Sequence, residues 1–166
     1  MGGRPLGLPI WHPAVMLATW FGIGLLPVAP GSWASLAALP LAWGIRSLFG
    51  FASLAAASAF AFFAGWWASG IVARASTVKD PGAIVIDEIA GQWLVLLAAP
   101  LDPLAYALAF LLFRVFDTWK PWPARWADRH VKGGLGIVLD DLLTAVYAVL
   151  VLLGLLTARE AFGVRS

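Results

Sequence analysis

Cysteine is absent from this chain of 166 residues, and only two histidines are present. The absence of cysteine excludes disulfide bonds, thiolate metal sites and a cysteine nucleophile. Charged residues are scarce as well: they make up 12% of the sequence, about half of the ~25% typical of soluble domains. Hydrophobic residues make up 61%. Polar side chains are too few to cover a soluble fold of this size, so we predict a membrane protein.

The sequence also lacks a basic tract. Its basic residues are spread along the chain and its formal net charge is only +2, so we expect no nucleic-acid partner. The length suits one domain, and we interpret residues 1–166 as a single domain. Trp11, His12 and Pro13 interrupt the first apolar run, so we do not expect a removable signal peptide.

Runs without charge predict the helices. Residues 47–73 form the longest clear run and are predicted to be a transmembrane helix, and residues 142–158 a second one. Residues 89–101 and 103–113 meet at a Pro-Leu-Asp-Pro turn, which predicts a helical hairpin. A helix over 84–99 would be only about 24 Å long, so it either thins the bilayer or packs inside the bundle. The expected fold is an all-α, multihelical, membrane-embedded bundle with a short helical hairpin.

The first 45 residues are predicted to hold two further segments. Residues 14–26 are expected to associate with the membrane, and Ser32 is expected to be the N-cap of a helix that ends near Ile45. Orientation follows from the basic residues, because six of the eleven lie in the two connections that flank the hairpin. The positive-inside rule places these connections in the cytoplasm. The six residues are Arg74, Lys79, Lys120, Arg125, Arg129 and Lys132.

Seven of the nine acidic residues fall in three short segments. The first segment contains Asp80, Asp87 and Glu88, and the last two of these interrupt an apolar run. An ionised carboxylate at such a position costs several kcal/mol unless it is paired or bound to a metal. A cation between Asp87 and Glu88 would also relieve their mutual repulsion. The alternative is that they reach the membrane surface beside Arg74 or Lys79.

The second segment combines acids and bases with several tryptophans. Arg114 and Asp117 are three residues apart and share a helix face, as do Asp117 and Lys120. Pro121 predicts that this helix stops at Lys120. The alternative interpretation is an aromatic belt with basic anchors at the membrane interface. Further along, the turn that begins at Lys132 can offer backbone N–H groups to a phosphate.

The third segment contains Asp140 and Asp141, which are predicted to open a hydrophobic helix. Capping is the alternative role, but it needs only one acid, and the other points about 100° around the helix. Carboxylates without cysteine suit a hard cation such as Mg²⁺, and nearby Arg and Lys suit a phosphate. We therefore predict metal-assisted hydrolysis or transfer at the phosphorus of a lipid. Carboxylates from the three segments are expected within about 8 Å of one another.

These motifs, in the same order, resemble those of the bacterial phosphatidylglycerophosphatase A family from about residue 16 to residue 150. The resemblance implies a Mg²⁺-dependent phosphatase that converts phosphatidylglycerophosphate to phosphatidylglycerol and phosphate. It also implies a multi-pass protein of the bacterial inner membrane with its site facing the cytoplasm. The segments that carry it are Ala29-Pro30-Gly31-Ser32, Asp80-Pro81-Gly82 with Asp87-Glu88 and Gly91, Phe113-Arg114 with Asp117 and Lys120-Pro121, and Asp128-Arg129 with Lys132-Gly133-Gly134 and Asp140-Asp141.

The resemblance further implies which residues form the site. Six acids are candidates for metal binding or water activation, and all of them except Asp128 are candidate metal ligands. Which acid binds the metal and which activates water stays open. The acids are Asp87, Glu88, Asp117, Asp128, Asp140 and Asp141. The candidate phosphate-binding residues are Arg114, Lys120, Arg129, Lys132, Gly31 and Ser32.

Four alternative functions differ from this one in the residues that they require. A histidine nucleophile would have to be His12 or His130. A lipid phosphotransferase of the CDP-alcohol type is disfavoured because its aspartate-rich motif is missing. A small transport protein with a cation pathway would place its acids near the bilayer midplane in broken helices. A scaffold subunit without chemistry does not explain the density of charged motifs.

Overall fold

The computed structural model describes residues 6–77 and 82–161, and within them every regular element is a helix. This confirms the all-α prediction. The helices are, in chain order, α1 (Pro13–Ala18), the short 3-10 helix η1 (Ile23–Leu25), α2 (Pro30–Phe49), α3 (Phe51–Ala75), α4 (Ile86–Ala98), α5 (Pro103–Trp119), α6 (Ala124–His130) and α7 (Gly133–Ala161).

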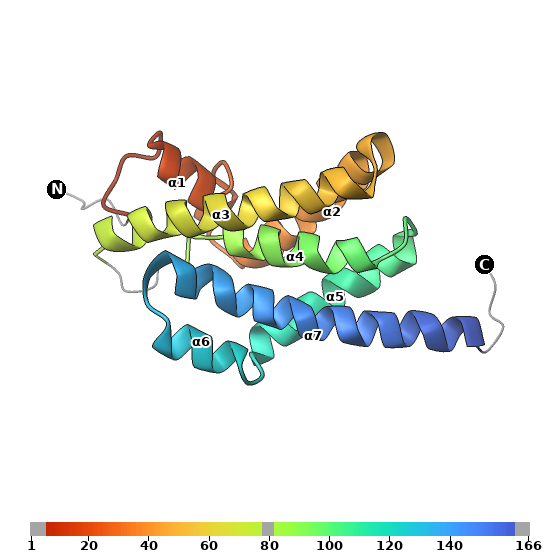
Figure 1. Cartoon of the computed structure of the whole chain (residues 1–166). Helices are drawn as coiled ribbons and strands as arrows, with labels where there is room; N and C mark the ends of the chain where they lie inside the picture. The colour runs from red at the N-terminus through yellow and green to blue at the C-terminus, as the bar shows by residue number, and fades with distance from the viewer. Residues whose placement is uncertain (1–5, 78–81, 162–166) are drawn as a thin grey trace.

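Helix α4 is the central element of the bundle. It packs against α2, α3, α5 and α7, and α3 and α7 also pack against each other. Figure 1 shows α1, the end of α3, α6 and the start of α7 at one end of the molecule. The α2–α3 and α4–α5 turns lie at the opposite end. We call these the α6 end and the Gly50 end.

Small residues allow α3 and α7 to approach closely at the α6 end. A Cβ atom at Gly134 would come within 2.2 Å of the carbonyl oxygen of Trp66 and 2.4 Å of the backbone nitrogen of Gly70. Such contacts between backbones are typical of helices that associate through glycine. Larger apolar side chains fill the centre of the bundle, among them the fully buried Leu96 and Phe113.

The predicted hairpin is confirmed. Helices α4 and α5 are joined by the Pro-Leu-Asp-Pro turn, and the Asp102 side chain caps α5 by accepting a hydrogen bond from the Ala105 N–H at 2.8 Å. The predicted stop at Lys120 is also confirmed, because α5 ends at Trp119 and Lys120 is its C-cap with φ +46°.

Three predicted helix boundaries are wrong. The run 47–73 is not one helix, because Gly50 has a left-handed φ of +85° and separates α2 from α3. Ser32 is not an N-cap: α2 begins at Pro30, where proline suits the first helical position, and runs past Ile45 to Phe49. Asp140 does not open a helix, because α7 already begins at Gly133. The alternative interpretation of Asp140 and Asp141, as caps of a helix, is therefore wrong.

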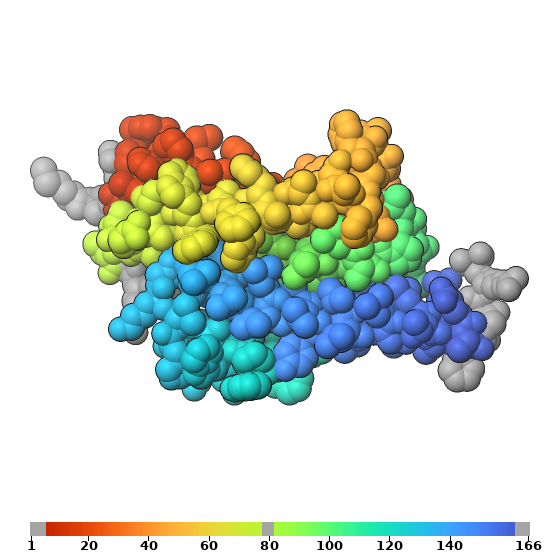
Figure 2. Space-filling view, in the orientation of Figure 1, coloured from red at the N-terminus to blue at the C-terminus, as the bar shows by residue number. Residues whose placement is uncertain are grey.

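Two of the described helices, α3 and α7, are long and apolar enough to cross a bilayer, by length and composition. Both lie at the surface in the view of Figure 2. Helix α3 exposes large aromatic side chains, including Phe60, Phe63 and Trp67. An apolar surface of this kind supports association with a membrane.

Candidate metal and phosphate site

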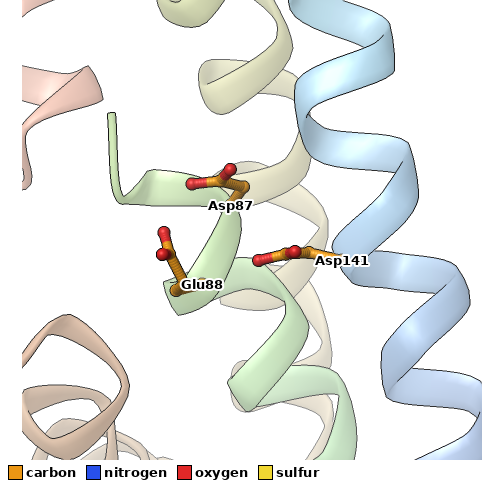
Figure 3. Close-up of side chains that lie close together, drawn as sticks. All are labelled: Asp87, Glu88 and Asp141. Carbon is orange, nitrogen blue, oxygen red and sulfur yellow. The ribbon is translucent and has the colours of Figure 1, made fainter. Parts of the chain in front are cut away.

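Three carboxylates from two helices converge near the α6 end. Asp87 and Glu88 belong to the first turn of α4, and Asp141 lies in the third turn of α7. One oxygen atom from each of the three lies within 4.8 Å of the others, and Figure 3 shows the side chains turned toward a common space. We call these three residues the carboxylate cluster. They come from the first and third acidic segments of the sequence.

Gly91 sets the distance between the two helices that carry the cluster. A Cβ atom at this position would lie 2.7 Å from the ring of Phe113 and 3.2 Å from the carbonyl oxygen of Asp141. Any larger residue would therefore push α4 away from α5 and α7. The glycine, one turn after Asp87, keeps α4 close to Asp141.

Each member of the cluster has a buried oxygen atom with no hydrogen-bond partner among the described residues. These atoms are Asp87 Oδ1, Glu88 Oε2 and Asp141 Oδ2. Buried polar atoms are normally satisfied, so three orphaned acceptors in one place require an explanation. Their donor set, oxygen atoms of carboxylates only, fits a hard divalent cation such as Mg²⁺.

The pKa values of the two carboxyl groups on α4 also fit a cation site. Burial raises the pKa of Asp87, and the negative charges of Glu88 and Asp141 raise it further. Burial is also the main cause that raises the pKa of Glu88, with the charge of Asp117 adding to it and that of Arg114 opposing it. A bound cation would favour the ionised form of both carboxyl groups.

Lys120 connects three helices beside the cluster. From the end of α5 its ammonium group forms an ion pair with Asp140 in α7, and it lies 3.7 Å from Asp128 Oδ1 in α6. Burial lowers the pKa of Lys120, but the charge and hydrogen bond of Asp140, with the charges of Asp141 and Asp128, raise it by more. The net pKa is above the usual value, so Lys120 is a cation at neutral pH.

Arg114 is the second cation at this place. Its Nη1 atom lies 2.7 Å from Asp117 Oδ2, one turn along α5, and 3.5 Å from Ser35 Oγ in α2. The charge of Asp117 acts on both Glu88 and Asp141. Asp117 and Arg114 therefore lie near the carboxylate cluster, but they are engaged with each other.

The remaining residues that the sequence suggests for the site are not members of the carboxylate cluster. Gly31 packs directly against Glu88, and Ser32 is partly buried beside it at the start of α2. Arg129 is exposed on α6, and Lys132 is exposed in the connection to α7. Asp80 and Lys79 lie outside the described residues. Asp128 is exposed and contacts Lys120.

The sequence interpretation missed Gln92. This residue is 0% exposed, lies one turn after Glu88 on α4, and neither its Oε1 nor its Nε2 atom has a partner among the described residues. Its spacing of four residues from Glu88 was the available signal, because residues i and i+4 share a helix face. Ser35, which contacts Arg114, was missed as well.

A group of carboxylates that fits a hard cation, next to an arginine and a lysine, is typical of proteins that act on phosphate esters. Comparison with known proteins specifies the class further. The chain belongs to the phosphatidylglycerophosphatase A family, whose model matches residues 16–156. This confirms the resemblance seen in the sequence.

Three relatives illustrate this membership. Phosphatidylglycerophosphatase A of Escherichia coli strain K12 is 39% identical over 137 residues, which cover 82% of this chain and 77% of that protein. The Haemophilus influenzae protein of the same name is 39% identical over 145 residues, 87% of this chain and 89% of its own length. A Bacteroides thetaiotaomicron protein with the provisional name phosphatidylinositol-3-phosphatase is 37% identical over 152 residues, 87% of this chain and 91% of its length. No solved structure matches the chain.

Proposed function

We propose that this protein is a Mg²⁺-dependent phosphatidylglycerophosphatase. It hydrolyses the terminal phosphate of phosphatidylglycerophosphate and yields phosphatidylglycerol and inorganic phosphate. Family membership over residues 16–156 supports the phosphatase activity and this substrate. The observation that carries the metal requirement is the carboxylate cluster: one oxygen atom from each of its three acids lies within 4.8 Å of the others, and each acid has a buried oxygen without a partner among the described residues.

The proposed metal ligands are Asp87, Glu88 and Asp141. When bound there, Mg²⁺ would supply polarisation of a phosphoryl oxygen and a lowered pKa for a water molecule. Two other candidate ligands are engaged in ion pairs, Asp117 with Arg114 and Asp140 with Lys120. We therefore assign Asp117 and Asp140 the role of holding these two cations in position.

Arg114 and Lys120 are the proposed ligands of the substrate phosphate. Both are cations fixed by a carboxylate, so little side-chain entropy is lost when they bind an anion. The raised pKa of Lys120 keeps it charged at neutral pH, as phosphate binding requires. One of the three acids of the carboxylate cluster would activate the attacking water molecule by accepting its proton.

We also propose that α7 crosses the bacterial inner membrane, as part of a multi-pass bundle that includes α3, with the α6 end in the cytoplasm. Residues 142–161 of α7 amount to about 30 Å of helix, which equals the thickness of the hydrocarbon core. Asp140 and Asp141 would then lie at the membrane surface, where a lipid head group is within reach. Arg74, Lys120 and Lys132 lie toward the same end, in agreement with the positive-inside rule.

The alternative function, a small cation transport protein, requires the acids to lie at a different depth in the membrane. A cation pathway would need acids near the bilayer midplane, in broken helices. The carboxylate cluster lies instead in the first turn of α4 and the third turn of α7, and α7 continues unbroken beyond it to Ala161. This position favours the enzyme.

The experiment is to measure phosphate release by the detergent-purified protein, with Mg²⁺ and with EDTA. Phosphatidylglycerophosphate, phosphatidic acid and phosphatidylinositol 3-phosphate are offered separately. Mg²⁺-dependent release with preference for phosphatidylglycerophosphate is expected. Preference for the inositol lipid would correct the substrate but keep the chemistry. Release that is equal in EDTA would overturn the metal proposal, and no release from any lipid would overturn the phosphatase.

A further inference from the structure

A surface hollow of about 390 Å³ lies on α6 and the segment that leads into it. Its volume is in the range of small-molecule sites, about 300–1,000 Å³. The lining combines aromatic and cationic side chains, and none of its lining residues is acidic. The residues that matter here are Trp119, Trp122, Trp126, Arg125, Arg129 and His130.

The positive charge of the hollow is not cancelled by the acid of α6. Asp128 is directed to Lys120, with its Oδ1 atom 3.7 Å from Lys120 Nζ. Arg125 is held in place because its Nη2 atom donates a hydrogen bond to the Trp119 carbonyl at 2.9 Å. A guanidinium has five N–H donors, so further donors can bind an anion. The hollow therefore has a positioned cation for a negatively charged group.

The tryptophans of the hollow are unusually exposed. Trp119, Trp122 and Trp126 have 61%, 76% and 50% of their surface accessible. Exposed indole rings are unfavourable in water but favoured at the level of lipid head groups. The ring of His130 stacks on Trp126 with 5.4 Å between ring centroids, which stiffens this wall.

The hollow adjoins the proposed phosphate site along the chain. Trp119 directly precedes Lys120, and Arg129 directly follows Asp128, the residue that faces Lys120. The same connection between α5 and α6 thus carries the Lys120 ammonium group and the rim of the hollow. A ligand with two anionic groups can engage both.

We propose that this hollow binds the phosphodiester of the lipid substrate. The inference rests on the proposed function: such a lipid has a terminal phosphomonoester, which is hydrolysed, and a phosphodiester, which is retained. Arg125 and Arg129 bind the diester oxygens, and the tryptophans contact the glycerol and the first acyl carbons. The substrate class is therefore a glycerophospholipid with both a phosphodiester and a phosphomonoester. Phosphatidic acid, whose only phosphate is a monoester, cannot occupy both places.

The kinetic test compares a lipid substrate in mixed micelles with a water-soluble substrate. Phosphatidylglycerophosphate contains the diester, whereas glycerol 3-phosphate contains only the monoester. For Arg125→Gln, we expect the ratio of kcat/KM for the lipid to that for glycerol 3-phosphate to fall about tenfold, mainly through a higher KM. The matched control is Arg159→Gln near the end of α7, which should leave the ratio unchanged. An unchanged ratio in Arg125→Gln would overturn the proposal.

A binding measurement separates this inference from the proposed function, because it needs no turnover. The protein is labelled with 5-fluorotryptophan, and ¹⁹F resonances of Trp122 and Trp126 are assigned with single Trp→Phe variants. Dihexanoylphosphatidylglycerol, a diester without a monoester, is then titrated in the presence of EDTA. Both resonances should shift in the unmodified protein and shift far less in Arg125→Gln.

Two other outcomes would overturn the inference, and a third would overturn only the proposed function. Equal shifts with inorganic phosphate alone would make the hollow a free-phosphate site. Shifts with the lipid but an unchanged kinetic ratio would make it a site for bulk membrane lipid. If the protein released no phosphate from any lipid but the shifts depended on Arg125, the proposed function would fail while a phosphodiester site remained.

Discussion

Gly31 and Glu88 are in such close contact that a Cβ atom at position 31 would come within 2.0 Å of Glu88 Oε1. The first turn of α2 therefore forms one wall of the carboxylate cluster. We predict that Gly31→Ala preserves the fold, because the obstructed atom is the end of a flexible side chain. The displaced carboxylate should raise the Mg²⁺ concentration for half-maximal activity about tenfold or more. Phosphate release measured against Mg²⁺ concentration checks this.

The matched control lies in the same helix. A Cβ atom at Gly44 would meet nothing within 4 Å, so Gly44→Ala should leave the Mg²⁺ dependence unchanged. It should stabilise the protein by about 0.5–1 kcal/mol, because alanine favours the helix over glycine. Identical Mg²⁺ curves for the two variants would show that the contact of Gly31 with Glu88 has no part in metal binding.

Asp141→Asn tests the cluster itself. We expect this variant to lose Mg²⁺-dependent phosphate release while remaining inserted and folded. The exchange removes one of three like charges, so the unfolding temperature in EDTA should rise. Mg²⁺ at a hundred times its Kd should raise the free energy of unfolding of the unmodified protein by about 2.7 kcal/mol. This stabilisation by Mg²⁺ should be lost in the variant. Thermal unfolding in detergent, with Mg²⁺ and with EDTA, measures both.

The control for this exchange is Asp102→Asn at the Gly50 end. Asp102 caps α5 through the Ala105 N–H at 2.8 Å, and asparagine caps helices equally well. Activity and Mg²⁺ stabilisation should therefore be unchanged. Normal turnover by Asp141→Asn would remove that residue from the site.

Features determined by neighbouring residues could be predicted from the sequence. The hairpin turn at Asp102 and the helix end at Lys120 both follow from a proline that comes next in the chain. The break at Gly50 could not be predicted in the same way, because a glycine inside an apolar run carries no charge signal. The start of α7 differs from the prediction because two consecutive glycines, Gly133 and Gly134, are typical of a turn, whereas here the second of them is required for close packing on α3.

The candidate site shows a similar division. The scarcity of charge made Asp87, Glu88 and Asp141 conspicuous, since unpaired acids in an apolar run are costly. Arg129 was grouped with Asp128 because they are adjacent in sequence. Successive helical residues point about 100° apart, so Asp128 faces Lys120 while Arg129 lines the hollow. Such an assignment needs the helix α6, which the sequence interpretation missed.

The ion pair of Lys120 predicts its reactivity. Only a neutral amine reacts with acylating reagents, and the raised pKa keeps Lys120 protonated. We expect mass spectrometry to show slower acetylation at pH 9 for Lys120 than for the exposed Lys132. A lysine with a raised pKa contributes stability that is complete below its unfolded pKa, and this is lost only as pH rises through the folded pKa. The contribution should therefore be constant from about pH 8 to pH 9. Equal labelling of the two lysines would contradict the ion pair with Asp140.

Gly134→Ala tests whether the contact between α3 and α7 positions the site. The obstructing atoms are backbone atoms of Trp66 and Gly70, which cannot turn away as a side chain can. We expect the free energy of unfolding to fall by about 1–3 kcal/mol, as for overpacked cores. Activity should fall with it, because Asp140 and Asp141 lie only two turns further along α7.

Gly154→Ala in the same helix is the control for this exchange. A Cβ atom there would meet nothing within 4 Å, so neither stability nor activity should decrease. Denaturant unfolding in mild detergent and phosphate release at saturating Mg²⁺ measure the two effects. If Gly134→Ala lost stability but kept full activity, α7 would hold Asp141 in place without its contact to α3. The packing of α7 on α4 beside Gly91 would then be enough to position the carboxylate cluster.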